Sequence, residues 1–142
     1  MRKRTQGREA ALQMLYQSEF LKGDSVQEMV TTFWSTNKEK ELDQTSRDFA
    51  EKIVYGVLNN IVAIDEVVSK YAQNWNLSRM AIIDRNVLRL ATFELLHCDD
   101  IPPKVTINEA VNMAKRFSQI DSGKFVNGIL DRIVHAEKIT KE

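Results

Sequence analysis

The pair Gly123-Lys124 is the part of this chain that most resembles a phosphate-binding motif. A loop of the P-loop type requires G-x-x-x-x-G-K-[ST], because successive backbone N–H groups must surround the phosphate ahead of the lysine. Here Ser118 stands where the first glycine would be, and Phe125 follows Lys124. Both ends of the motif are missing, so the sequence does not support a nucleotide-binding loop.

Residues for metal binding or covalent catalysis do not form a complete set. The chain has one cysteine, Cys98, and two histidines, His97 and His135, whereas a zinc site needs three or four converging ligands. Cys98 as a nucleophile with His135 as its base stays open, although a packed thiol is the commoner role of such a cysteine. Ser122 lacks the G-x-S-x-G context of a nucleophile elbow. We therefore expect no enzymatic activity, no metal and no cofactor.

One carboxylate, Glu94, falls on the apolar side of its expected helix, close to the stripe of Ile83, Val87 and Leu90. A buried carboxylate can serve catalysis. Because the sequence offers it no catalytic partner, we expect Glu94 to form a structural hydrogen bond or ion pair.

The N-terminus carries a separate signal. Residues 1–8 (MRKRTQGR) hold Arg2, Lys3, Arg4 and Arg8 and no acid, whereas the rest of the chain holds 16 cations and all 20 acids. A net charge of zero thus conceals a basic segment on a mildly acidic body. Such a segment is typical of nucleic-acid contact. A solvated, frayed terminus is the alternative.

Composition indicates one globular domain covering residues 1–142. The chain is 43% hydrophobic and 28% charged, which is ordinary for a folded soluble protein. No apolar run approaches the ~20 residues that span a bilayer. The basic start is not followed by the apolar segment and cleavage site of a signal peptide. A single cysteine excludes an intramolecular disulfide, so we expect a reducing, cytoplasmic setting and no membrane association.

Sparse punctuation predicts an all-α fold of about seven helices without strands. The only prolines are the adjacent Pro102 and Pro103, and the chain has five glycines, so long segments are uninterrupted. The polar stretch 35–46 is the best loop candidate. We expect helices over about 5–21, from 25 past 33, over 47–75 with a break at Asn59-Asn60, over 79–97, from 106, and from 121 or 122 past 133.

Helix starts are predicted from cap residues. Ser25 with Glu28, and Thr106 with Glu109, fit the spacing of a capping box. Ser78 is a candidate N-cap for the helix that follows it.

The last helix accounts for most of the segment around Gly123-Lys124. Asp121 or Ser122 can cap it, and Val126, Ile129, Leu130 and Ile133 form its core stripe. Phe125 lies at the edge of this stripe, where its ring either packs on a neighbouring helix or stacks on a base. A mid-helix glycine costs ~1 kcal/mol relative to alanine, so we expect another helix or a ligand to approach the backbone at Gly128.

Four segments, in order, carry a resemblance to a known family: REAALQMLYQSEF, DRNVLRLATFELL, VTINEAVNMAKRF and DSGKFVNGILDRI. The chain resembles the NusB family of bacterial transcription antitermination factors over nearly its whole length. The resemblance implies an all-α fold of two three-helix-like subdomains.

The implied function is that of an RNA-binding adaptor without cofactor or catalysis. Family members bind single-stranded boxA RNA of ribosomal RNA operon transcripts together with NusE, a small-subunit ribosomal protein. The assembly helps RNA polymerase to read through terminators. Some members hide their RNA surface in a homodimer, and the resemblance leaves monomer and homodimer both open.

The resemblance also assigns residues by position. The Arg-rich N-terminus of the family corresponds to Arg2, Lys3, Arg4 and Arg8, with Thr5, Gln6 and Gly7 interrupting it. The NusE-facing surface corresponds to Tyr16 and Asp84. The remaining RNA surface corresponds to Arg89, Lys104, Phe117, Asp121, Lys124, Phe125 and Asn127.

Two other functions remain as alternatives. NusB-like domains also occur at the N-terminus of certain ribosomal RNA cytosine methyltransferases, but residues 1–142 contain no βαβ segment to hold a methyl donor. A purely protein-binding helical scaffold with an inert basic segment would bind NusE and no RNA.

Overall fold

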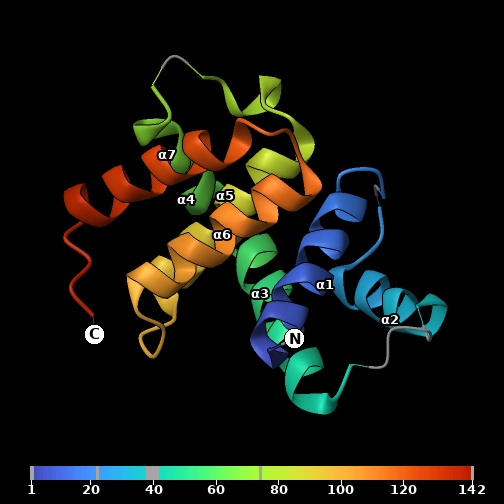
Figure 1. The fold of residues 1–142 in the computed structure, drawn as a ribbon. Coiled ribbons are helices and arrows are strands. Elements are labelled where there is room, and N and C mark those ends of the chain that lie inside the picture. The colour runs from blue at the N-terminus through green and yellow to red at the C-terminus, as the bar shows by residue number, and fades with distance from the viewer. Residues whose placement is uncertain (1, 22, 38–41, 74, 142) are drawn as a thin grey trace. The chain divides into compact units, whose positions relative to one another are not determined.

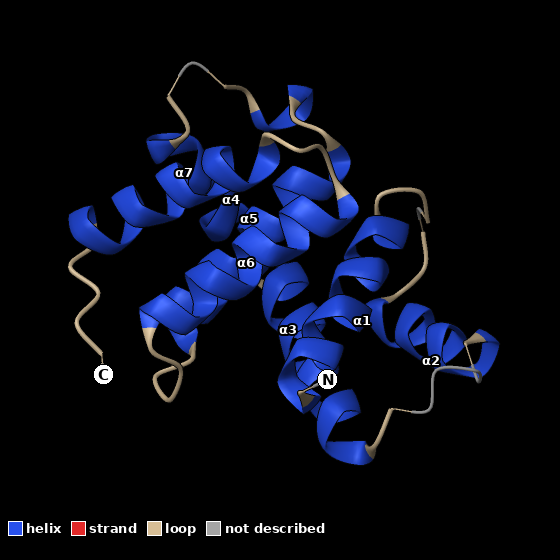
Figure 2. Cartoon of the chain, viewed as in Figure 1, coloured by secondary structure: helices blue, strands red, loops and turns tan. Residues whose placement is uncertain are grey.

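The structure is a computed structural model that describes residues 2–21, 23–37, 42–73 and 75–141. Every regular element in these residues is helical, as the sequence predicts (Figures 1 and 2). The elements are α1 (Lys3–Ser18), α2 (Val26–Thr36), α3 (Gln44–Asn59), α4 (Ile61–Tyr71), the short 3₁₀ helix η1 (Leu77–Arg79), α5 (Ile82–His97), α6 (Pro103–Phe117) and α7 (Ser122–Ala136).

The chain divides into two compact units, Met1–Asn59 and Asn60–Glu142. Unit 1 contains α1, α2 and α3, and unit 2 contains α4 to α7 with η1. The boundary coincides with the pair Asn59-Asn60, where we expected one helix to end and the next to begin. Asparagine is unfavourable inside a helix, because its side chain hydrogen-bonds to nearby backbone groups in non-helical conformations.

In unit 1, α1 and α3 pack closely because Gly7 lets their backbones approach. A Cβ atom at Gly7 would lie 2.8 Å from the carbonyl oxygen of Ser46 and 3.1 Å from Cδ2 of Phe49. The core of this unit includes Leu15, Phe33 and other apolar residues that are almost completely buried. Their burial removes apolar surface from water and stabilises the unit.

In unit 2, α5 is the central helix and packs on α4, α6 and α7. Nine of the ten residues of α5 from Asn86 to Leu95 are buried. Helices α6 and α7 form an αα-hairpin across the short connection 118–121 (Figure 1). At the other end of α5, the Lys141 ammonium donates to the carbonyl oxygens of Glu94 and Cys98, at 2.7 and 2.6 Å. These carbonyls also accept from the backbone N–H groups of Cys98 and Ile101, and a cation beside them is favourable at a helix C-terminus.

Several helix boundaries are confirmed. The Ser25 hydroxyl accepts from the Glu28 N–H and donates to the Glu28 carboxylate, both at 3.1 Å, so Ser25 is the N-cap of α2, as predicted. Helix α7 begins at Ser122 and continues past Ile133, as predicted. The predicted loop 35–46 is shorter than expected, and its residues 38–41 lie outside the described residues.

Other predicted starts are wrong, and each has a local cause. Helix α3 begins at Gln44 rather than Arg47, because Oδ1 of Asp43 accepts from the Ser46 N–H at 2.9 Å and caps the first turn. Helix α6 begins at Pro103, since proline needs no N–H partner at the first helical position. Thr106 therefore lies within that helix and forms no capping box with Glu109.

Two more corrections concern α1 and α5. Helix α1 covers Lys3–Ser18 instead of 5–21, so most of the basic segment is helical. Helix α5 begins at Ile82 rather than near Arg79, because η1 occupies Leu77–Arg79 and Ser78 belongs to that turn.

No helix in the described ranges is long and apolar enough to cross a bilayer. Among the same residues, no three His, Cys, Asp or Glu side chains gather closely enough to hold a metal ion.

Candidate nucleic-acid interface

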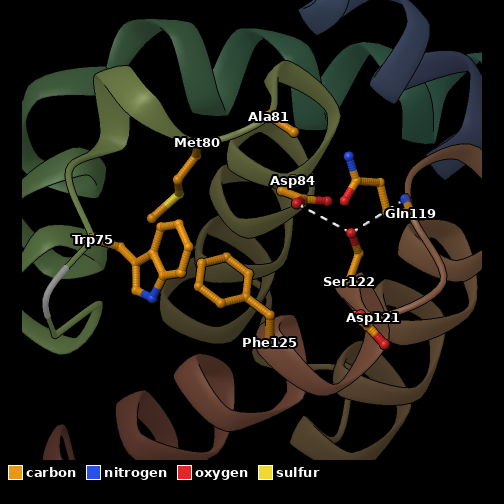
Figure 3. Close-up of a pocket in the computed structure, with 8 residues that line it drawn as sticks. All are labelled: Trp75, Met80, Ala81, Asp84, Gln119, Asp121, Ser122 and Phe125. Carbon is orange, nitrogen blue, oxygen red and sulfur yellow. Dashed lines mark hydrogen bonds between the residues drawn. The ribbon is translucent and has the colours of Figure 1, made fainter.

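Unit 2 has a hollow of about 320 Å³ between the start of α5 and the start of α7 (Figure 3). One side is aromatic and apolar, and the other side carries carboxylate, amide and hydroxyl groups. The lining residues are Trp75, Met80, Ala81, Asp84, Gln119, Asp121, Ser122 and Phe125.

The polar side is organised by the Ser122 hydroxyl, which is almost fully buried. Its oxygen lies 3.1 Å from Oδ2 of Asp84 and 3.3 Å from the Gln119 N–H (Figure 3). It also lies 3.1 Å from the Ser118 hydroxyl. A hydroxyl has one proton, and an ionised carboxylate can only accept, so Ser122 donates to Asp84 and accepts from the other two. These bonds fix the connection between α6 and α7 to the first turn of α5.

The other oxygen of Asp84, Oδ1, is buried and has no hydrogen-bond partner in the described part of the chain. Buried acceptors are usually satisfied, so an unpaired carboxylate oxygen beside a hollow favours a ligand or partner with an N–H or O–H donor.

The aromatic side consists of Phe125 and Trp75. Phe125 is half-buried, and its ring meets the Trp75 ring edge to face at 5.3 Å between centroids, with an interplanar angle of 70°. Trp75 itself is 56% exposed. The structure therefore combines the two expectations for Phe125: the ring packs on a neighbour and also borders a hollow open to solvent.

The first turns of α7 also carry exposed charged and polar side chains. Lys124 and Asn127, three residues apart on α7, are both exposed and share one helix face. Asp121, also exposed, occupies the N-cap position of α7, but its side chain makes no capping bond. The Asp121 side chain therefore does not cap α7, contrary to the expectation. The Ser122 hydroxyl instead accepts from the Gln119 N–H in the turn before the helix.

Phe117 ends α6 on the same side of the α6–α7 connection. It is 38% exposed, and the Arg116 guanidinium carbon lies 5.0 Å from its ring centroid. The structure thus brings Phe117, Asp121, Lys124, Phe125 and Asn127 to one end of the α6–α7 hairpin.

Two other residues from the sequence prediction do not join this cluster. Lys104 is exposed at the start of α6, and 13 residues of helix place it ~20 Å along the axis from Phe117. Arg89 is only 15% exposed and forms a bidentate pair with Asp65 of α4, at 2.8 Å and 2.9 Å. Because Nε and Nη2 are engaged in this pair, we assign Arg89 to the packing of α4 on α5 instead of to RNA contact.

The basic N-terminal residues are part of α1 in unit 1. Arg2, Lys3 and Arg4 are exposed, and Lys3 pairs with Asp43 at 3.1 Å. Arg8 is 2% exposed, with its guanidinium carbon 5.2 Å from the Phe49 ring centroid. The expectation that Arg8 contacts RNA is therefore not compatible with this packing, and three surface cations remain.

The two residues expected to face NusE differ in exposure. Tyr16 on α1 is 39% exposed, and its ring lies 5.3 Å from that of Phe20. Asp84 lies at the hollow in unit 2 and is half-buried.

Trp75 is the site residue that the sequence prediction missed. An aromatic residue just before the polar N-L-S segment indicates a loop position, yet the sequence does not show that it lies against Phe125, 50 residues away. The expected approach of another helix at Gly128 is wrong, since among the described residues a Cβ atom there would meet Nη1 of Arg132 alone, at 3.9 Å; approach of a ligand stays a prediction.

Residues considered for chemistry have structural roles. Glu94 is fully buried and accepts from the Thr106 hydroxyl at 2.9 Å, as the expectation of a structural hydrogen bond predicts. Cys98 is 1% exposed, as suits a packed thiol.

Comparison with known proteins connects this geometry to a family. The family model described as NusB family matches residues 5–135. The chain belongs to the NusB family. The resemblance drawn from the four sequence segments is therefore confirmed.

Curated NusB proteins match along most of the chain. The transcription antitermination protein NusB of Sorangium cellulosum is 47% identical over 130 residues, which cover 92% of this chain and 90% of the relative. The protein of the same name from Geotalea uraniireducens is 46% identical over 137 residues, covering 94% of each chain.

Solved NusB structures share the fold. NusB of T. maritima has a TM-score of 0.83 and 40% identity, covering 93% of this chain and 90% of that one. A chain in the crystal structure of the antitermination factors NusB and NusE with double-stranded RNA has a TM-score of 0.83 and 26% identity, covering 96% and 98%. The all-α fold predicted from the sequence is thus confirmed.

Proposed function

We propose that this chain is a cytoplasmic transcription antitermination factor, without enzymatic activity, that binds boxA RNA of ribosomal RNA operon transcripts together with NusE. In this role it would act within the RNA polymerase antitermination complex. The observation that carries the proposal is the likeness, over 96% of the chain, to a chain in a solved complex of NusB and NusE with RNA.

The surface at the start of α7 has the groups that single-stranded RNA requires. An aromatic ring at a surface edge, such as Phe125, can stack on an unpaired base for ~1–3 kcal/mol. Lys124 neutralises phosphate charge, and the Asn127 amide offers both a donor and an acceptor to a base edge. Phe117 and Asp121 belong to the same proposed surface at the hairpin end. For Lys104, at the opposite end of α6, we propose a separate phosphate contact.

The first turn of α1 supplies the second set of phosphate contacts in the proposal. Arg2, Lys3 and Arg4 are exposed there, and the N-cap residue Arg2 makes no side-chain capping bond. The unpaired N–H groups of a helix N-terminus attract anions, and the three cations add to that attraction. In this proposal Arg8 contributes to packing in unit 1 and Arg89 to packing in unit 2, instead of to RNA contact.

For NusE we propose contacts at Tyr16 and Asp84. Tyr16 presents a half-exposed ring with a hydroxyl, and the buried Oδ1 of Asp84 lacks a donor within the described part of the chain. Both features suit a protein surface, where aromatic anchors and buried polar pairs dominate affinity.

The function is tested by transcription in vitro through a terminator downstream of a boxA leader, with RNA polymerase, NusE and the other antitermination factors. We expect the full chain to raise read-through on the boxA template and to leave a template with scrambled boxA unchanged. Equal read-through on both templates would contradict the proposal.

A further inference from the structure

We propose that unit 1 carries a second binding site, in a hollow between α2 and α3, for an acidic segment of a partner protein. Arg47 would bind the carboxylate. No residue of this site belongs to the surfaces assigned above to RNA or NusE, so the inference stands independently of them.

The hollow has a volume of about 460 Å³ and is formed by one stripe of each helix. Residues four apart in a helix lie on one face, so both stripes are continuous. The α2 stripe includes Val30, Thr31 and Trp34, and the α3 stripe consists of Arg47, Glu51 and Tyr55.

Trp34 is a fixed wall of this hollow. Its indole N–H donates to Oε2 of Glu51 at 2.9 Å, and its ring meets Phe33 edge to face at 5.1 Å and 78°. Phe33 is buried in the core of the unit. The indole is thereby oriented before any ligand arrives, which lowers the cost of binding.

Arg47 lies over this wall with a donor left unpaired. Its guanidinium carbon is 4.7 Å from the Trp34 ring centroid, and its Nε is buried without a hydrogen-bond partner in the described residues. Leaving a charged donor buried and unsatisfied costs free energy, and native proteins rarely retain one without a reason. An anionic group in the hollow would pair with the guanidinium that carries this donor.

The charge of the site selects the class of ligand. Arg47 and Glu51 are the only charged residues that line the described hollow, and they cancel. A nucleic-acid strand binds where cations are in excess, because affinity comes from neutralising several phosphates. A single carboxylate, by contrast, matches one guanidinium in charge and geometry.

The rest of the lining fits a protein segment around that carboxylate. Glu51 can accept from a backbone N–H of the ligand, while Val30 and the Trp34 ring offer apolar contact. Thr31 and Tyr55 carry hydroxyl groups that can pair with backbone carbonyls. A groove between two helices is a common place for such a segment.

The indole N–H signals of the two tryptophans provide the test, because Trp34 lies at this hollow and Trp75 lies in the other unit. The ¹⁵N-labelled full chain is titrated with the capped peptide acetyl-Ala-Glu-Ala-amide and, separately, with acetyl-Ala-Gln-Ala-amide. We expect the Glu peptide to shift the Trp34 signal and to leave the Trp75 signal in place. We expect the Gln peptide to bind at least tenfold more weakly.

Two variants on α3 complete the design. Arg47→Gln should abolish the shift caused by the Glu peptide, while Lys52→Gln, which removes an exposed cation outside the hollow, should leave it unchanged. An unaltered circular dichroism spectrum and a well-dispersed amide spectrum show that each variant is folded. Peptide shifts in Arg47→Gln are measured from its own free Trp34 signal, because the guanidinium no longer lies over the ring. If Arg47→Gln is not folded, Arg47→Lys takes its place, and the expected result is weaker binding of the Glu peptide because the planar fork is lost.

Three results would overturn the proposal. They are no shift of the Trp34 signal, an equal shift with both peptides, and a shift that survives Arg47→Gln. An RNA oligonucleotide that shifts the Trp34 signal in an Arg47-dependent way, in place of the peptide, would likewise reject a protein partner.

Discussion

At the scale of single residues, Phe125 shows how one side chain serves both packing and contact. Its ring is fixed by Trp75 on one side and borders the hollow on the other. A fixed ring loses little conformational entropy when a base stacks on it.

We therefore predict that Phe125→Ala weakens binding of boxA RNA by ~5- to 150-fold, the loss of ~1–3 kcal/mol of stacking. Because the ring is only half-buried, the melting temperature should fall less than for Val126→Ala, which truncates a fully buried neighbour. Fluorescence anisotropy and thermal unfolding provide the two readouts. A large loss of stability with intact RNA binding would assign Phe125 to the core alone.

Residue types and spacing predicted part of the site and could not predict the rest. The stripe of α7 placed Phe125 at an edge, and this is where the structure has it. Spacing within one helix does not reveal partners on other helices, so the pairing of Arg89 with Asp65 and the burial of Arg8 against Phe49 of α3 were not foreseen. Trp75 was missed for the same reason.

At the scale of elements, helix ends depend on single caps. The Ser46 backbone N–H, followed by the Lys3 side chain, lowers the pKa of Asp43 below its usual value. A carboxyl whose pKa is lowered by folding stabilises the folded state above its unfolded pKa, and this contribution disappears as the pH falls through the folded value.

We predict that Asp43→Ala lowers the melting temperature at neutral pH, because the first turn of α3 loses its cap. Asp43→Asn should keep most of the stability, since asparagine also caps. It should also reduce the decline in stability below about pH 4, the region in which an ordinary Asp carboxyl titrates. Melting temperatures of the three proteins between acid and neutral pH measure this. Identical acid profiles for wild type and Asp43→Asn would contradict the role given to the charge.

Gly7 tests the packing of α1 on α3, and Gly128, a helical glycine of α7, is its control. Gly7→Ala should destabilise the protein by ~1–3 kcal/mol, because the added methyl group collides with the Ser46 carbonyl. Gly128→Ala should instead stabilise it by up to ~1 kcal/mol, since the position is open and alanine favours helix. Denaturant unfolding distinguishes the signs, and a stabilising Gly7→Ala would contradict the close approach.

The elements themselves were well predicted from periodicity and punctuation, whereas only some of their ends were. Sparse glycine and proline and the Asn59-Asn60 pair were sufficient for the helices and the main break. Helix α6 starts at Pro103 and α3 is capped by Asp43, although other residues nearby were also plausible caps. The sequence does not show which of these residues takes the cap conformation. Gly7 and Gly128 look alike in sequence, and only the neighbouring helix distinguishes them.

At the scale of the whole molecule, each unit contributes exposed cations to the proposed RNA contacts. Three exposed basic residues open α1, and Lys124 stands at the start of α7. Removing residues 1–8 entirely would also remove Gly7 and the buried Arg8, so substitution is the cleaner experiment.

We predict that the triple variant Arg2→Ala, Lys3→Ala, Arg4→Ala reduces the slope of log affinity against log salt by about 2, from three phosphate contacts on a single strand. The fold should persist because all three side chains are exposed. Affinity for boxA RNA at several salt concentrations measures the slope. A slope equal to that of the wild type would exclude these cations from the RNA interface.

The most direct test of the central claim is fluorescence anisotropy of a labelled boxA RNA and of a scrambled RNA, with and without NusE, at two salt concentrations. The proposed function predicts preferential binding to boxA that NusE strengthens and that persists at the higher salt. Equal, weak binding to both RNAs that disappears at the higher salt would contradict it, and would leave a basic helix start on a scaffold that binds protein alone.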